Sequence, residues 1–326
     1  MIVPPHSHIP SMDDVRRAAK TIAHVAHRTP LYRSEYLSQR LDANVYLKLE
    51  CHQPTRVFKI RGAANKMLNL DQAQREHGVV AASSGNHGFA VSYVARLLQI
   101  PATIVVPTHA VQEKVMAIKE QGAKVIKQGR SHGQRYARAL RIQKEQGVTL
   151  VHPFDDPEVI AGQGTIGLEI LQDLPNVDTV LVPVGGGGLI SGISLAIKTQ
   201  KPETRIYGVQ SKNAPSMFES LRTGRLVRLK DYMTIADGLA PGEPGRITFQ
   251  IVRKYVKEVL LVSEQRIKWA TKMALESLHL LIEPSAASVL AALGRRYDPT
   301  KGENLVLVIS GGNISLRLLR ELICDR

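Results

Sequence analysis

Short apolar runs alternate with amphipathic stretches along most of the chain. Runs of four to six mostly apolar residues recur, for example at 102–106, 179–184 and 305–309. Such runs are typical of parallel strands that are buried on both faces, and the stretches between them have helical spacing. The pattern predicts an α/β fold in which open, mostly parallel sheets are flanked by helices. Functional sites are then expected at the carboxyl ends of the strands.

The predicted elements follow one another in a regular order. Strands are predicted at residues 44–49, 78–82, 102–106, 124–127, 179–184, 205–210 and 305–309. Helices are predicted at 12–26, 62–70, 111–121, 134–146, 165–172 and 189–199, with a further helix that follows Asn86 and ends near Leu98. Ser11 is placed as the N-cap of the first helix. Loops are predicted at 153–162 and 238–245, and the second is either an ordered turn-rich loop or a mobile lid.

Composition and charge narrow the class of protein. The 326 residues are 44% hydrophobic and 22% charged, which is ordinary for a soluble globular enzyme, and the length suggests two domains. The net charge of +14 could attract nucleic acid, anionic lipid or an anionic ligand. No nucleic-acid-binding module, Lys/Arg-rich tract or apolar run of about 18 residues accompanies that charge. We therefore expect no nucleic-acid partner and no membrane partner.

The cysteines and the N-terminal sequence bear on location. Cys51 and Cys324 are far apart in the sequence, which suggests reduced thiols. The first ten residues, MIVPPHSHIP, lack the basic start and the apolar run of a signal peptide. Both features predict a cytoplasmic protein.

The strongest local feature is VPVGGGGLISG at residues 182–192. An apolar strand runs into Gly185, Gly186, Gly187 and Gly188 and then directly into a helix. Consecutive glycines let backbone N–H groups converge on an anion, and the helix N-terminus adds its dipole. The spacing fits neither the dinucleotide fingerprint nor the P-loop. We expect a phosphate-binding loop, and the alternative is a tight strand–helix turn without a ligand.

Three further segments carry candidate chemistry. Lys59 stands between Phe58 and Ile60, so partial desolvation could lower its pKa and let it attack a carbonyl; the alternative is a snorkelling surface lysine. The segment SSGNHG at 83–88 could cradle a carboxylate or be a plain capping turn. Ser310, in SGGN, offers a hydroxyl at the carboxyl end of a strand.

Together, and in this order, these segments resemble the serine/threonine dehydratases and serine racemases, which are pyridoxal 5'-phosphate (PLP) enzymes of fold type II. The resemblance extends from about residue 11 to residue 315. Its motifs are KLE at 48–50, FKIRGA at 58–63, SSGNHG at 83–88, HP at 152–153, AGQGT at 161–165, VPVGGGG at 182–188, IADG at 235–238, IEPSA at 282–286 and SGGN at 310–313. Nine motifs in register form a specific signal.

The resemblance implies a two-domain architecture of the tryptophan synthase β-like kind, with the cofactor between the domains. Residues 1–69 and 152–326 would form a large PLP-binding domain, and residues 70–151 a small inserted domain that closes over the substrate. It also implies a homodimer formed through the large domain.

Roles for individual residues follow from the same resemblance. Lys59 would form a Schiff base with PLP, and Phe58 would lie against the pyridine ring. Backbone amides of Gly185, Gly186, Gly187, Gly188 and Leu189 would hold the phosphate. Asn86 would bind the phenolic oxygen and Ser310 would face the pyridine nitrogen, while Ser83, Ser84, Gly85 and His87 would surround the substrate carboxylate. Glu283 lies near the cofactor in relatives, with a structural role as the alternative.

The implied activity is β-elimination of water from a 3-hydroxy amino acid such as L-threonine or L-serine, which gives a 2-oxo acid and ammonia. Lys59 would remove the Cα proton. One alternative is a serine racemase, in which Ser84 would act on the opposite face of Cα. Another is a 3-hydroxyaspartate dehydratase, in which Arg135 would bind the second carboxylate unless it is a solvated helix arginine.

The chain departs from the family pattern at several positions. Relatives usually read TGSFK, whereas Arg56 and Val57 stand here in place of Gly and Ser. Metal-activated members carry two carboxylates where this chain has Gln210 and Ser216. Because a hard cation needs anionic oxygen ligands, we expect no metal site. After IADG, Ala240, Pro241 and Gly242 replace the hydroxyls of racemases, which weakens the racemase interpretation.

Overall fold

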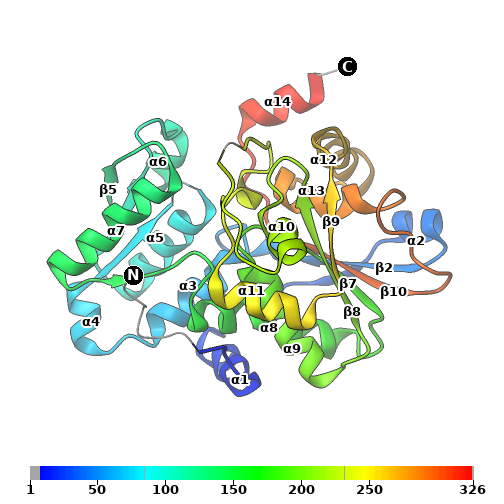
Figure 1. The fold of residues 1–326 in the computed structure, drawn as a ribbon, viewed down its shortest axis with the longest axis horizontal. Coiled ribbons are helices and arrows are strands. Elements are labelled where there is room, and N and C mark those ends of the chain that lie inside the picture. Colours follow the sequence, from blue (N-terminus) through cyan, green and yellow to red (C-terminus); the bar gives the residue numbers. More distant parts are fainter. Residues whose placement is uncertain (1–7, 84, 231, 325–326) are drawn as a thin grey trace.

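The computed structural model describes residues 8–83, 85–230 and 232–324, and it contains two separate sheets (Figure 1). The six-stranded sheet has the order β1 (Leu31–Arg33), β2 (Asn44–Leu49), β10 (Asn304–Ile309), β7 (Thr179–Pro183), β8 (Arg205–Ser211) and β9 (Glu258–Val262). The four-stranded sheet has the order β5 (Lys124–Lys127), β4 (Ala102–Val106), β3 (Val79–Ala82) and β6 (Thr149–Leu150). Each neighbouring pair is parallel except β1 and β2. The predicted α/β fold with mostly parallel sheets is confirmed.

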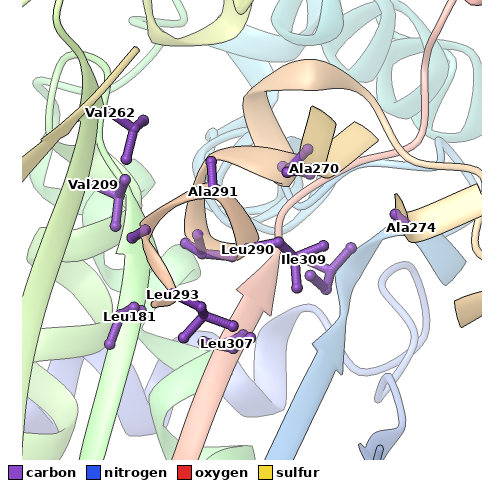
Figure 2. Packing of buried hydrophobic residues seen from close by; sticks show 14 of the residues in the cluster. Leu181, Val209, Val262, Ala270, Ala274, Leu290, Ala291, Leu293, Leu307 and Ile309 are labelled. Carbon is purple, nitrogen blue, oxygen red and sulfur yellow. The ribbon is translucent and has the colours of Figure 1, made fainter. Parts of the chain in front are cut away.

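Helices cover both faces of the six-stranded sheet. One face packs on α2 (Glu35–Leu41), α12 (Glu264–Leu278) and α13 (Pro284–Ala292). The opposite face packs on α8 (Pro157–Asp173), α9 (Gly188–Gln200), α10 (Ser216–Thr223) and α11 (Arg246–Tyr255). Figure 2 shows how Leu290 and Ala291 of α13 lie over Leu181, Leu307 and Ile309 of the sheet. Because alternate strand residues point to opposite faces and helices cover both, the central strands β7 and β10 are apolar along most of their length.

The four-stranded sheet has its own core. It packs on α3 (Lys59–Leu68), α5 (Asn86–Leu98) and α6 (Gln112–Glu120) on one side and on α7 (His132–Gln146) on the other. Val80 and Val105 face α7, whereas Ala81 and Ile104 face α5. This unit, on the left in Figure 1, lies beside the six-stranded unit, and α3 connects the two.

The first helix is shorter than its apolar spacing predicts. Ser11 caps it as predicted, in a capping box with Asp14. The helix α1 (Met12–Thr21) ends before Val25 and Ala26, although the prediction extended to residue 26. Both residues are still buried, because they pack against the core of the four-stranded unit as a turn. The spacing therefore marked burial correctly but not the backbone conformation.

The loop predicted at 153–162 ends earlier than predicted, since α8 already begins at Pro157. Asp156 caps this helix by accepting hydrogen bonds from the N–H groups of Glu158 and Val159. A Cβ at Gly162 would lie 2.6 Å from the carbonyl oxygen of Arg61 in α3, and a Cβ at Gly164 would lie 3.1 Å from the carbonyl oxygen of Gly192 in α9. The glycines are there because α3 and α9 pack closely against α8.

Several elements were not predicted. They are β1, α2, η1 (Glu50–His52), α4 (Gln72–His77), β6, α10, η2 (Asp237–Leu239), α11, β9, α12, α13 and α14 (Leu316–Cys324). The predicted strands at 102–106 and 124–127 match residue for residue. None of the helices in the described part of the chain combines the length and apolarity that a membrane-spanning helix requires.

Candidate active site

A cavity of about 480 Å³ lies between the two units, at the carboxyl ends of β3, β7 and β10. Open parallel sheets place their sites at this edge. All but one of the predicted site residues line the cavity, from both units: Phe58, Lys59, Ser83, Gly85, Asn86, His87, Arg135, Gly185, Gly186, Gly187, Gly188, Leu189 and Ser310. Ser84 lies outside the described residues.

Lys59 is the first residue of α3 and points into the cavity. The preceding segment is fixed to the end of β10, because Val57 bridges Gly311 and the N–H of Phe58 donates to the carbonyl of Ser310 at 3.1 Å. The amine of Lys59 donates to the carbonyl of Pro153 at 2.6 Å. Burial lowers the pKa of Lys59 to about 8, against an opposing effect of the Glu283 carboxylate. A substantial fraction of this amine is therefore neutral, and so nucleophilic, near pH 8.

Arg56 adopts a backbone conformation that favours glycine. Its φ is +57°, and the turn that it forms is held by hydrogen bonds from its N–H to Gln53 and from the N–H of Gly312 to its carbonyl. A side chain in this region costs about 1 kcal/mol. We expect Arg56→Gly to raise the free energy of unfolding by roughly 0.5–1 kcal/mol and the melting temperature by about 2 °C. Arg56→Ala is the control, since it keeps the Cβ; equal stability of the two variants in thermal unfolding would contradict the prediction.

The four glycines form a crowded turn that leads into α9. Gly187 has a φ of +96°, and a Cβ at Gly186 would lie 2.5 Å from the ring of Phe154. A Cβ at Gly185 would lie 2.7 Å from the carbonyl oxygen of Gly238. Close packing thus accounts for part of the glycine content. Because α9 begins without a side-chain cap, the N–H groups of its first turn remain able to bind an anion in the cavity.

Asn86 is held between two polar side chains. Its Nδ2 donates to both carboxyl oxygens of Glu283, at 2.9 Å each, and its Oδ1 accepts from Nδ2 of Asn313 at 2.9 Å. Glu283 lines the cavity and is 4% exposed. Burial and the Asp237 carboxylate raise the pKa of Glu283 to about 7, although Asn86, Lys114 and Lys59 oppose the shift. Sequence reasoning gave Asn313 no role, although it lies in the SGGN motif.

The start of α5 provides a second set of backbone N–H groups that no side chain of the described residues caps. Gly85 is its N-cap and supplies no side-chain cap, and a Cβ at Gly85 would meet open space. The side chain of His87 turns away from the helix axis, because its Nε2 donates to the carbonyl of Val151 at 2.8 Å. Burial, and then the nearby Lys59, lower the pKa of His87 to about 3, so the ring is neutral. A carboxylate at this helix start would be bound by backbone N–H groups and by Ser83 rather than by an ionised imidazole.

Cationic side chains line the part of the cavity that α6 and α7 contribute. Arg135 is half-buried and donates through Nη1 to the carbonyl of Arg130 at 3.2 Å, and its Nε has no hydrogen-bond partner among the described residues. Burial lowers the pKa of Arg135, with an opposing effect of Tyr232. Lys114 pairs with Asp237 of the six-stranded unit at 2.7 Å. Nothing in the sequence pattern singled out Lys114.

A buried ionic cluster supports α3 beneath the cavity. Arg61 pairs with Glu50 at 2.8 Å and with Glu169 at 2.6 Å, and Lys48 pairs with Glu169 at 2.6 Å. Two positive charges thus balance two negative ones. Burial opposes the ionisation of Glu50, but Arg61 and Lys48 outweigh it and hold the pKa of Glu50 below its usual range. Three of these residues lie in the sequence motifs, yet no pattern revealed that the four meet.

The positions compared with metal-activated relatives hold neutral side chains. Gln210 and Ser216 are buried; Gln210 accepts from the N–H of Phe218 at 3.2 Å and Ser216 donates to the carbonyl of Pro241 at 3.3 Å. Within 8–83, 85–230 and 232–324, no group of three or more His, Cys, Asp or Glu side chains could hold a metal ion. We expect steady-state activity to change less than about twofold in excess EDTA. A strong loss that added Mg²⁺ restores would contradict this prediction.

The fold thus brings a buried lysine and a glycine-rich turn before an uncapped helix start to one cavity. The sequence matches the family described as "Pyridoxal-phosphate dependent enzyme" over residues 22–311, and the chain belongs to that family. It is 47% identical to the L-threonine ammonia-lyase of Thermotoga maritima over 313 residues, which cover 96% of this chain and 78% of that protein. It is 44% identical to the L-threonine dehydratase catabolic TdcB of Staphylococcus aureus over 316 residues, which cover 95% and 91%.

Solved structures agree with this assignment. Maize serine racemase superposes with a TM-score of 0.92 at 38% identity and covers 97% of each chain. The processed form of threonine deaminase isoform 2 from Solanum lycopersicum superposes with a TM-score of 0.89 at 34% identity and covers 99% of this chain and 92% of that one. The cofactor is therefore PLP. The residues present suit it, because a lysine of lowered pKa and an uncapped helix start face one cavity.

Proposed function

We propose that this chain is an ammonia-lyase that eliminates water from L-threonine or L-serine and releases a 2-oxo acid and ammonia. The observation that carries the proposal is the cavity in which Lys59, with its lowered pKa, lies with two uncapped helix starts. One helix start suits the cofactor phosphate and the other suits the substrate carboxylate. The names of the relatives from Thermotoga maritima and Staphylococcus aureus support the same activity.

Each residue has a defined task in this proposal. When bound, PLP withdraws electrons from the substrate and makes its Cα proton acidic. Lys59 would hold the cofactor covalently, and its free amine would remove the Cα proton of the bound substrate. The N–H groups of Gly185–Gly188 and Leu189 would hold the phosphate, and Phe58 would lie against the ring. Ser310 would hold the pyridine nitrogen and Asn86 the phenolic oxygen.

Substrate binding is proposed at the start of α5. The N–H groups of this helix start, with Ser83 and Gly85, bind the substrate carboxylate. His87 fixes the backbone at the start of α5, because its ring donates a hydrogen bond to the carbonyl of Val151. Excluding water from the cavity then depends on how closely the two units approach each other.

We further propose that residues 70–151 form a small domain that closes over the substrate, while 1–69 and 152–326 form the large domain. The separate sheets and cores of the two units support this division. A homodimer and a cytoplasmic location are proposed as well. Both cysteines are free thiols, which suits a reducing compartment.

The test is a panel of hydroxy amino acids with purified protein. We expect L-threonine and L-serine to give 2-oxo acid and ammonia in equal amounts. Release of ammonia without 2-oxo acid, or no reaction with any 3-hydroxy amino acid, would contradict the proposal. Adding 3-hydroxyaspartate tests Arg135, whose unpartnered Nε suits a second carboxylate.

A second candidate function is serine racemisation, which the similarity to maize serine racemase and the presence of Ser84 favour. Racemisation needs a proton delivered from the face of Cα opposite Lys59, where the sequence resemblance puts Ser84. We expect Ser84→Ala to retain L-serine dehydration within about tenfold, or roughly 1.4 kcal/mol in barrier. Any formation of D-serine should fall by roughly 100-fold or more. Equal losses of both activities would show that Ser84 serves the carboxylate site instead.

A further inference from the structure

Two polar contacts bridge the cavity from the four-stranded unit to the six-stranded unit. In the first, Nδ2 of Asn86, at the start of α5, donates to both carboxyl oxygens of Glu283, at the start of α13. In the second, Lys114 of α6 pairs with Asp237 of η2 at 2.7 Å. All four side chains line the same cavity. Both contacts therefore connect the two units within one cavity.

We propose that Glu283 is a positioning residue for Asn86, and that the Lys114–Asp237 ion pair controls whether Glu283 carries a proton. Closure of the cavity and ionisation of Glu283 are then linked. The inference rests on the proposed function only in that Asn86 faces the cofactor.

The carboxyl group of Glu283 is fixed by its surroundings. Its backbone N–H donates to the carbonyl of Gly311 at 3.1 Å, and a Cβ at Gly311 would lie 2.8 Å from its Oε1. On the far side of Asn86, Asn313 donates to Oδ1 of Asn86 and also to the carbonyl of Thr55 at 3.1 Å. The amide of Asn86 thus has one defined orientation. An ionised carboxylate holds it with two acceptor oxygens, whereas a protonated one turns one oxygen into a donor.

The groups that face Glu283 come from every element packed around it. Lys59 of α3 and Lys114 of α6 favour its charged form, and Asp237 of η2 opposes it. From η1, Cys51 contributes no charge at neutral pH, because burial raises the pKa of its thiol to about 11 with a further contribution from Glu283. Burial of the Glu283 carboxyl group, together with the negative charge of Asp237, raises the pKa of Glu283 to about 7. A change of one neighbouring charge therefore decides its ionisation at physiological pH.

The two members of the ion pair belong to different units. Asp237 lies in the same unit as Glu283, whereas Lys114 lies on α6 of the other unit. When the units separate, Lys114 and Asn86 both move away from Glu283, and Asp237 stays. Glu283 then takes up a proton, because it has lost a neighbouring positive charge and a hydrogen-bond donor. When the units close, Lys114 returns, Glu283 ionises, and the Asn86 amide is fixed as the cavity is sealed.

The experiment is a pH titration of the holoenzyme by infrared spectroscopy, which follows the carbonyl band of protonated carboxyl groups. The band that titrates near pH 7 should disappear in Glu283→Gln, which keeps the size of the side chain. Its midpoint should rise in Lys114→Met and fall in Asp237→Asn, by roughly half a unit to one unit. Lys119→Met is the matched control, because Lys119 is exposed on the same helix, and it should leave the midpoint unchanged.

The absorbance of the bound cofactor gives a second readout, which a purely structural role of Glu283 would not move. We expect a step near pH 7 in the natural protein and in Lys119→Met, and no step in Glu283→Gln. The inference is overturned if Glu283→Gln retains the infrared band or the absorbance step, or if the two charge variants leave the midpoint in place. Neither readout needs turnover, so a protein without lyase activity would still decide the question.

Discussion

Replacing Lys59 by alanine is expected to lower turnover of hydroxy amino acids by roughly 10³-fold or more while the fold persists. The variant removes the amine that binds the cofactor covalently and also the base for the Cα proton. Lys59 donates to the Pro153 carbonyl at the cavity wall, so its replacement breaks no buried ion pair among the described residues. Steady-state rates with L-threonine and L-serine provide the measurement.

The same variant separates covalent from non-covalent cofactor binding. After borohydride reduction, mass spectrometry should locate the cofactor on Lys59 of the natural protein and nowhere in Lys59→Ala. In cofactor-free protein, reaction of Lys59 with a carbonyl reagent should rise with pH and reach half its maximum near pH 8, because the amine reacts only when deprotonated. Lys119→Ala is the control for both measurements. Retained activity together with retained cofactor attachment would rule out the assignment.

Replacing Arg61 by methionine is expected to lower the free energy of unfolding by about 3–5 kcal/mol. Arg61 is 1% exposed and pairs with both Glu50 and Glu169, so its loss leaves two buried carboxylates with Lys48 alone. Desolvation of an uncompensated charge, rather than loss of contact area, sets the size of the effect. Denaturant unfolding gives the measurement.

Two further variants serve as comparisons for the loss of stability in Arg61→Met. Arg61→Lys should lie between the natural protein and Arg61→Met, because a lysine cannot bind two carboxylates through a planar fork. Arg16→Met removes an exposed pair with Asp13 on α1 and should change stability by less than about 1 kcal/mol. If Arg61→Met costs no more than Arg16→Met, the cluster does not stabilise the fold.

Features that depend on neighbouring residues could be predicted from the sequence, whereas features that depend on contacts between distant segments could not. Strands such as Ala102–Val106 are short and mostly apolar, so their pattern identified them residue for residue. The start of α8 at Pro157 was missed, and only the fold explains its glycines, since Gly162 and Gly164 let α3 and α9 approach closely. The turn at Val25 and Ala26 was taken as helix because burial has the same spacing there.

The sequence by itself determined the α/β class, the family and the local shapes of the site. Glycine runs, helix starts and the lysine of FKIRG are properties of short segments, and their order along the chain identified the family. Only the tertiary structure decided which groups meet. Asn86 and Glu283 are 197 residues apart, and Lys114 and Asp237 are 123 apart, yet each pair forms a contact across the cavity. Charge state depends on such neighbours and on burial, and neither is encoded at any single position, so the ionisation of Lys59 and Glu283 follows only from the fold.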